Sequence, residues 1–145
     1  MILNIGAGMW NRQSEEVALD IDMSTAPDVC ANVEKLPFKD KTFKIIRACH
    51  VLEHVNDIVA TMNECERVLE EDGLMQIIVP HFPSTGAIAD PTHKRFFLVD
   101  TFGYFIRPGA LTGLRRTFEI IDLKKTKEEI YAVLRKSKSS FPANN

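Results

Sequence analysis

Short and almost uninterrupted runs of apolar residues recur along this chain of 145 residues. Runs of this length with few polar interruptions are typical of strands buried on both faces of a parallel sheet. The clearest runs cover residues 2–5, 17–21, 43–49 and 74–79, and a shorter one at 30–33 predicts a further short strand. The pattern therefore indicates an α/β protein built on a mostly parallel sheet.

A helical spacing of apolar residues lies between two of these runs. The apolar stripe consists of Ile58, Met62, Cys65, Val68 and Leu69. Asn56 or Asp57 can cap the first turn, and Asp72-Gly73 provides a stop signal. The spacing predicts a helix over about 57–70, which would connect two parallel strands.

The last third of the chain begins with an irregular stretch from Pro80 to Lys94, which is long enough to indicate a functional or mobile loop. A helix is expected from about Val99 or Asp100, closed by Pro108-Gly109. The runs 118–123 and 129–135 are joined by a turn-length link, which predicts an antiparallel hairpin.

The stretch from Lys136 to Asn145 is polar and is expected to fray. We therefore predict one domain over residues 1–136 and a polar tail over 137–145.

The first strand runs directly into Gly6-Ala7-Gly8. Glycine can take positive φ and has no Cβ, so a ligand can approach the backbone closely, as in nucleotide-binding α/β proteins. Only eight residues separate Gly8 from Val17, so this crossover holds at most one or two helical turns. A plain tight turn is the alternative interpretation.

Asp20 lies at the end of the second predicted strand. An acidic residue at this position can accept hydrogen bonds from both hydroxyls of a ribose. Alternatively, Asp20 or Asp22 caps the next turn through Ser24 and Thr25.

Composition narrows the function classes. The net charge of −2 does not favour nucleic acid or an anionic membrane as a partner, and no apolar run is long enough to span a bilayer. Three widely spaced cysteines fit neither a disulfide framework nor a zinc knuckle. We expect reduced cysteines in a cytoplasmic protein.

The order of these motifs resembles that of the class I S-adenosylmethionine-dependent methyltransferases, especially their small members. The shared pattern is LNIGAG, ALDID, LPF, F-x-x-I and HVLEHV over roughly residues 2–80, and residues 90–97 are similar to a block that follows the fifth strand. The resemblance implies a single-domain Rossmann-like fold with a C-terminal antiparallel hairpin. It also implies methyl transfer from S-adenosylmethionine to an unidentified small-molecule acceptor, with neither nucleic acid nor membrane as a partner.

The same resemblance implies the cofactor-binding residues. They are Gly6, Ala7 and Gly8 beneath the methionine portion, Asp20 with Ile21 at the ribose, Asn32 and Val33 at the adenine, and His50 near the sulfonium. Relative to the family, the first crossover is short and no segment precedes the first strand, so the cofactor is expected to be less enclosed.

Methyl transfer mainly requires alignment of the two partners, and a general base is needed only when the acceptor must lose a proton. Histidine titrates near neutral pH, so it is the natural candidate. We predict His93 and His50 as catalytic residues, with Asp90 near enough to orient His93. An ordinary surface or core role is the alternative for each histidine.

Two other functions fit parts of the chain. His50-Val51-Leu52-Glu53-His54 matches the H-x-x-E-H motif of inverted zinc peptidases, but that motif needs both histidines on one helical face, and here it follows a strand. We therefore expect no metal. The other alternative is a methyltransferase-like domain that only binds the cofactor or a protein partner, which the short first crossover favours.

Overall fold

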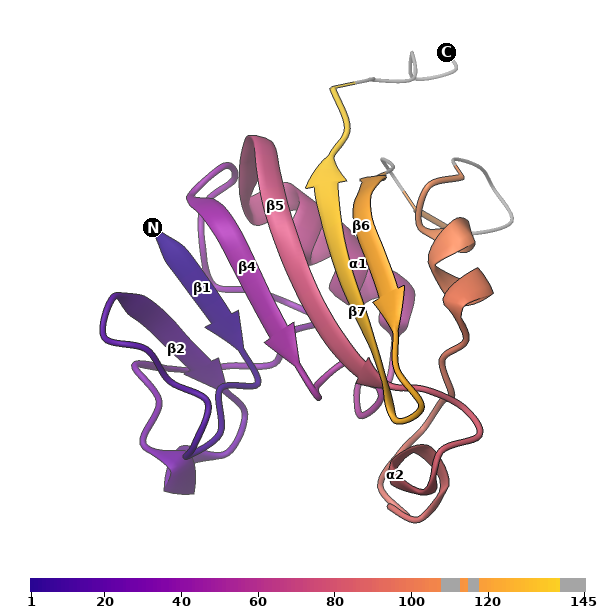
Figure 1. Cartoon of the computed structure of the whole chain (residues 1–145). Helices are drawn as coiled ribbons and strands as arrows, with labels where there is room; N and C mark the ends of the chain where they lie inside the picture. The colour runs from indigo at the N-terminus through magenta and orange to yellow at the C-terminus, as the bar shows by residue number, and fades with distance from the viewer. Residues whose placement is uncertain (108–112, 115–117, 139–145) are drawn as a thin grey trace.

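Seven strands form a single sheet in the order β3-β2-β1-β4-β5-β7-β6, in a computed structural model that describes residues 1–107, 113–114 and 118–138 (Figure 1). The strands are β1 (Ile2–Ile5), β2 (Glu16–Asp20), β3 (Val29–Cys30), β4 (Phe43–Cys49), β5 (Leu69–Pro80), β6 (Phe118–Lys125) and β7 (Glu129–Lys136). Strands β1 to β5 are parallel, whereas β7 is antiparallel to both β5 and β6. This confirms the predicted mostly parallel sheet with its C-terminal hairpin.

The helices are few and short. They are α1 (Ile58–Val68), α2 (Thr85–Ile88) and the 3-10 helices η1 (Met23–Thr25) and η2 (Val99–Tyr104). The predicted helix from residue 99 is thus a 3-10 helix, and its expected stop at Pro108-Gly109 lies outside the described residues. No helix within the described part of the chain is long and apolar enough to cross a membrane.

Helix α1 begins where the sequence predicts and ends earlier. Asp57 caps it, because its Oδ1 accepts a hydrogen bond of 2.9 Å from the Ala60 N–H. The next residue after α1, Leu69, has an extended backbone. It is fully buried and pairs with Phe43 of β4. The predicted stop at Asp72-Gly73 is therefore wrong: Asp72 and Gly73 lie within β5.

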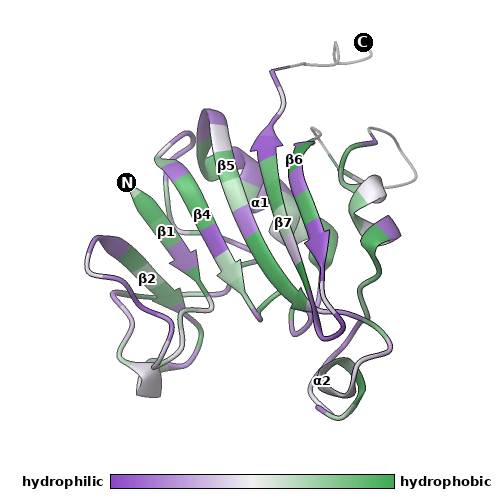
Figure 2. Cartoon of the chain, in the orientation of Figure 1, coloured by the Kyte–Doolittle hydropathy of each residue, from purple (hydrophilic) through white to green (hydrophobic). Residues whose placement is uncertain are grey.

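The sheet has one face covered by a helix. Figure 1 shows α1 behind the sheet and no helix of the described residues in front of β1, β4 and β5. Hydrophilic and hydrophobic bands alternate along β4 (Figure 2), where Ile46 and Ala48 are buried. Side chains alternate between the faces of a strand. The half-buried set of Ile45, Arg47 and Cys49 therefore lies on the other face, which we call the open face.

The first crossover, residues 6–15, contains no helix. A polar cluster fastens it instead. Asn4 donates from Nδ2 to Glu16 Oε2 at 3.0 Å and also to the Asn11 carbonyl, and Arg47 forms an ion pair with Glu16. Arg47 Nη2 also donates to Asn11 Oδ1 at 3.2 Å. These contacts tie the link between β1 and β2 to the open face of β4.

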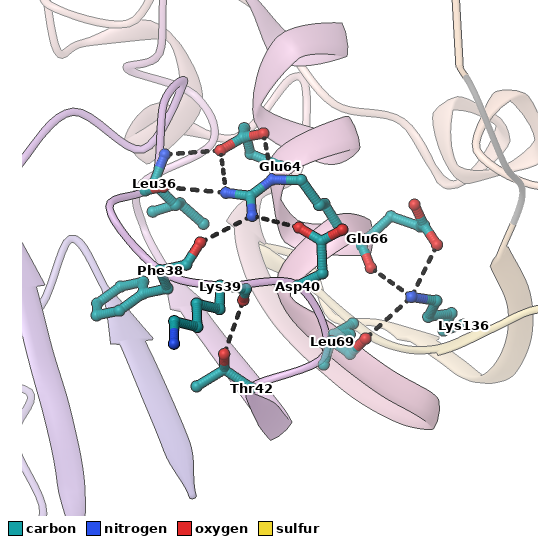
Figure 3. A network of polar contacts seen from close by, with 10 residues as sticks. Leu36, Phe38, Lys39, Asp40, Thr42, Glu64, Glu66, Leu69 and Lys136 are labelled. Atoms are coloured by element: carbon teal, nitrogen blue, oxygen red, sulfur yellow. Dashed lines mark hydrogen bonds and ion pairs between the residues drawn. The ribbon is translucent and has the colours of Figure 1, made fainter.

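A second polar network fixes the segment that leads into β4 (Figure 3). Arg67 of α1 donates to the carbonyls of Leu36 at 3.0 Å and Phe38 at 2.8 Å. Its guanidinium also forms ion pairs with Glu64 and Asp40. The hydrogen bond from Arg67 is the main reason that the pKa of Asp40 is lowered. The LPF motif of the sequence is thus held against α1.

Lys136 corrects the expectation of a frayed end. Its side chain is 2% exposed, and its Nζ donates to the carbonyls of Glu66 and Leu69 at 2.9 Å each (Figure 3). The Glu66 carboxylate lies 3.0 Å away. Lys136 is therefore an ordered residue of β7, and most of the predicted tail, residues 139–145, lies outside the described residues.

Candidate functional site

A pocket of about 380 Å³ lies at the carboxyl ends of the first four strands, where the loops after β1, β2, β3 and β4 meet. Open α/β sheets bind their ligands at this edge. Six of the eight predicted cofactor-binding residues line this pocket: Gly6, Asp20, Ile21, Asn32, Val33 and His50. Residues that are far apart in the sequence are therefore brought together at one concave surface.

Ala7 and Gly8 do not line the pocket. Ala7 is fully buried, and its N–H donates to the Leu19 carbonyl at 3.1 Å. Gly8 has a φ of +54° and donates its N–H to Asp20 Oδ2 at 2.8 Å. Gly6, with a φ of +61°, has no room for a side chain, because a Cβ would lie 2.5 Å from Val51 Cγ2. The turn thus orients Asp20 and accommodates Val51.

Asp20 is held by two backbone donors. Its Oδ2 accepts from Gly8, and its Oδ1 accepts from the Asp22 N–H at 2.9 Å. An ionised carboxylate offers about four acceptor positions, so capacity remains for two hydroxyl groups of a ligand. Asp22, rather than Asp20, caps η1, because it accepts from the Ser24 N–H at 2.8 Å. Hydrogen bonds from the Ser24 side chain and then from its backbone lower the pKa of Asp22.

The far side of the pocket combines apolar walls with one amide. Ile21 exposes 69% of its surface, and Val33, Val51 and Val55 are also lining residues. Asn32 lies among them, with its Oδ1 accepting from the Glu34 N–H at 2.9 Å. Such a surface suits a flat, mostly apolar ring that carries polar groups on its edge.

His50 lies in a turn after β4, with a φ of +53°. Its Nδ1 is 3.3 Å from Glu53 Oε1, and its Nε2 is 2.7 Å from Glu129 Oε1. These two carboxylates, Glu53 most strongly, raise the pKa of His50, although partial burial opposes them. Residues 50–55 form turns and no helix, so the helical arrangement that a zinc peptidase needs is not present.

The block at residues 90–97 fastens this turn. Arg95 donates from Nη1 to the carbonyls of Leu52 at 2.7 Å and Val55 at 2.6 Å. The backbone N–H of Lys94 donates to the Glu53 carbonyl at 2.8 Å. The sequence singled out this block but not its structural role, which depends on contacts across about 40 residues.

Several lining residues were not predicted from the sequence. They are Ala31, Glu34, Val51, His54, Val55, Asn56 and Lys94. Five of these seven belong to the segment 51–56 or follow His93 directly, so the HVLEHV motif and the later block were the signals that could have indicated them.

A second pocket of about 320 Å³ adjoins the first, since His50 and His54 line both. Both predicted catalytic residues, His50 and His93, line it. The His93 side chain is 7% exposed, and its Nδ1 lies 2.9 Å from the Ala87 carbonyl. Its Nε2 is 3.5 Å from Asp90 Oδ2, so Asp90 is as near as the sequence suggested.

Comparison with known proteins places these features in context. A family described as a methyltransferase domain matches residues 5–77. An uncharacterized protein of Methanocaldococcus jannaschii is 45% identical over 51 residues, which are 35% of this chain and 22% of that protein. The match therefore spans about a fifth of the length of this relative.

Solved structures share the fold at low identity. A SAM-dependent methyltransferase from Aquifex aeolicus has a TM-score of 0.72 at 12% identity, over 94% of this chain and 81% of that one. An S-adenosylmethionine-dependent methyltransferase from Mesorhizobium loti has a TM-score of 0.66 at 14% identity, over 92% and 90% of the two chains. The cyclase SpnF has a TM-score of 0.69 at 15% identity, over 93% of this chain and 74% of that one.

Proposed function

We propose that this chain, which belongs to the methyltransferase domain family, binds S-adenosylmethionine in the first pocket and transfers its methyl group to a small molecule. Family membership confirms the resemblance noted in the sequence and implies this cofactor. The observation that carries the proposal is the convergence of six predicted residues on one pocket, with Asp20 fixed by two backbone N–H groups.

The residues present fit the chemistry of the cofactor. Asp20 retains acceptor capacity for the two ribose hydroxyls, and Val33 offers apolar contact to the adenine beside the amide of Asn32. Gly6 lines the pocket at the end of β1, where the methionine portion is expected, and its missing Cβ makes room for Val51.

When bound, S-adenosylmethionine supplies a methyl group on a positively charged sulfur, which is an excellent leaving group. The task of the protein is then to align the acceptor with that methyl group and to exclude water. His50 and His54 stand where the two pockets meet. The acceptor would accordingly enter through the second pocket, where His50 and His93 can orient it or take its proton.

Titration calorimetry with S-adenosylhomocysteine tests the cofactor site. Asp20→Ala should weaken binding by about 1.5–3 kcal/mol, because a hydrogen-bonded charged group is lost. Asp22→Ala is the matched control, since Asp22 carries the same charge two residues away, caps η1 and does not line the pocket. Equal affinities for wild type and Asp20→Ala would show that Asp20 is only a turn residue.

A non-catalytic module that binds the cofactor is the second candidate. The helix-free first crossover favours it, because residues 6–15 add little cover to the pocket. A fold of this kind also serves other reactions, as the cyclase SpnF shows. Release of S-adenosylhomocysteine during incubation with pooled small molecules separates the two candidates. Release that depends on one acceptor supports the enzyme, and tight binding without release supports the module.

A further inference from the structure

We propose that Glu53, His54 and His93 bind a divalent transition-metal ion in the second pocket. One candidate ligand atom from each of these three side chains lies within 4.8 Å of the other two. Two of the residues follow β4 and the third belongs to the block at 90–97, so the fold brings the set together. This departs from the sequence-based expectation of no metal, and His50, part of the zinc-peptidase motif, is not one of the three.

Glu53 provides the first independent support. The residue is 1% exposed, and neither oxygen of its carboxylate accepts a hydrogen bond from the described residues. Its charged neighbour is His50, whose Nδ1 lies 3.3 Å from Oε1 without hydrogen-bond alignment. Buried carboxylates are normally paired, hydrogen-bonded or coordinated to a metal. His50 faces only Oε1, so Oε2 has no donor among the described residues, and a cation in the pocket would satisfy it.

The hydrogen bonds of His93 direct a lone pair toward a ligand. A backbone carbonyl can only accept, so the contact of 2.9 Å between Nδ1 and the Ala87 oxygen requires a proton on Nδ1. In the neutral ring, Nε2 then carries the lone pair. Metal-binding histidines typically have their other nitrogen held in this way.

His54 is prepared in the same manner. The Thr92 hydroxyl donates its single proton to Asp90 Oδ1 at 2.6 Å, because a carboxylate oxygen can only accept. The hydroxyl oxygen of Thr92 lies 3.1 Å from His54 Nδ1. Since its proton is already used, this oxygen must accept a hydrogen bond from Nδ1. Nε2 of a neutral His54 is left with the lone pair. Both histidines thus have an outer partner that fixes the tautomer a metal needs.

The negative charge of the residues that line the second pocket also favours a bound cation. Its lining includes the carboxylates of Glu53, Asp90, Glu128 and Glu129, and no lysine or arginine of the described residues lines it. The ring nitrogen Nε2 of His93 faces Asp90 Oδ2 at 3.5 Å. Two lone pairs at this distance repel each other unless a proton or a metal ion lies near them.

Two imidazoles and one carboxylate are the ligands of choice for Zn²⁺, Fe²⁺, Co²⁺ or Mn²⁺, and they suit Mg²⁺ and Ca²⁺ poorly. Three protein ligands also leave open positions on the ion, as in catalytic sites. This chemistry makes the second pocket a place where an oxygen atom of a ligand can join the metal.

The consequence for the acceptor rests on the proposed function. His54 lines both pockets, so an oxygen bound to the ion would face the cofactor. The expected acceptor is a hydroxyl or phenol whose proton is released to water when the oxygen binds the ion, so that His93 would hold the ion instead of taking the proton itself. The oxygen then forms a bond to the methyl carbon as the carbon–sulfur bond breaks, and S-adenosylhomocysteine leaves with the electron pair.

Titration of untagged, chelator-treated protein with Co²⁺, followed by its visible absorption, and then displacement by Zn²⁺ tests the site. Wild type should bind one equivalent. Glu53→Gln and His93→Gln should each weaken binding by at least about 10–100-fold, a loss that even an outer partner can cause. His81→Ala is the matched control, because it removes a histidine of the same loop that lines neither pocket. Its affinity should equal that of wild type.

Thr92→Val tests the outer partner of His54. If Thr92 had only a structural role, this substitution would leave the Co²⁺ affinity of the folded protein unchanged. It removes the acceptor of His54 Nδ1 while leaving all three proposed ligands in place, and should weaken Co²⁺ binding by about 10–100-fold. Absence of Co²⁺ and Zn²⁺ binding to folded wild type, or unchanged affinity in both Glu53→Gln and His93→Gln, would overturn the proposal. Folding of each variant is checked by its thermal melt.

Titration of the same samples with S-adenosylhomocysteine separates this proposal from the proposed function. If the protein binds S-adenosylhomocysteine but binds neither Co²⁺ nor Zn²⁺, the metal site is overturned and the proposed function stands. Binding of the metal without the cofactor product supports the metal site and contradicts the proposed function.

Discussion

Gly8, after the end of β1, acts through Asp20 at the end of β2. Gly8 does not line the first pocket, yet its N–H holds one oxygen of Asp20, which does. The sequence predicted both residues, since a glycine turn and an acidic strand end are local signals. Their contact spans 12 positions and depends on β1 and β2 lying side by side, so no local pattern could reveal it.

Gly8→Ala should therefore affect stability and binding together. Its φ of +54° disfavours a side chain, although a Cβ would meet no atom within 4 Å. We expect a loss of about 1–2 kcal/mol in the free energy of unfolding, the usual penalty of the left-handed conformation. Affinity for S-adenosylhomocysteine should fall as the N–H of residue 8 moves away from Asp20.

Urea unfolding and calorimetry measure the two effects. Gly103→Ala is the control, because Gly103 has no positive φ and a Cβ there also meets nothing within 4 Å. If Gly8→Ala leaves both quantities at wild-type values, the turn has no role in positioning Asp20.

At the level of elements, polar contacts replace a missing helix. The link between β1 and β2 has no helix, and Arg47 and Glu16 fasten it to β4. The Glu16 side chain is only 2% exposed, so Arg47 takes the place of water beside its carboxylate. Removal of one member of such a pair is more harmful than removal of both, because a buried charge is left alone.

Arg47→Met should lower the free energy of unfolding by about 3 kcal/mol, at the lower end for a broken buried pair, since 19% of the Arg47 side chain is exposed. The double variant Glu16→Gln/Arg47→Met should recover part of this loss. Urea unfolding of the two single variants and the double variant gives the coupling energy. Strictly additive effects would contradict the pairing.

Contacts between elements also explain which parts of the fold could be predicted from the sequence and which could not. Apolar runs predicted β1 and β4, because burial on a sheet requires them, and the turn-length link between residues 118–123 and 129–135 predicted the β6–β7 hairpin. The end of α1 was missed because Leu69 leaves the helix to pair with Phe43, a tertiary contact. Lys136 was expected to fray for the same reason: its partners, Glu66 and Leu69, lie almost 70 positions away.

For the whole molecule, the two pockets share one wall, formed by the turn after β4. Arg95 holds this turn through the carbonyls of Leu52 and Val55, so the loop from residue 80 to 95 is mechanically joined to both pockets. A ligand that fills the first pocket contacts the turn and should restrict the loop with it.

Hydrogen exchange across residues 80–95 should accordingly slow on saturation with S-adenosylhomocysteine, by an amount that exceeds any change in β6. Mass spectrometry of peptic fragments provides the measurement, and β6 serves as the internal reference, because none of its residues lines either pocket. Unchanged exchange across residues 80–95 would rule out a loop that responds to the ligand.

The one-sided cover of the sheet also divides its residues into two classes of mutational tolerance. Ile46 and Ala48 are buried in the core, where few other side chains fit. Ile45, on the open face, is only half-buried, so a longer or more polar side chain can extend toward solvent there. Protein engineers would thus find on the open face, within a single strand, positions for labels, crosslinkers or an added helix at alternate residues.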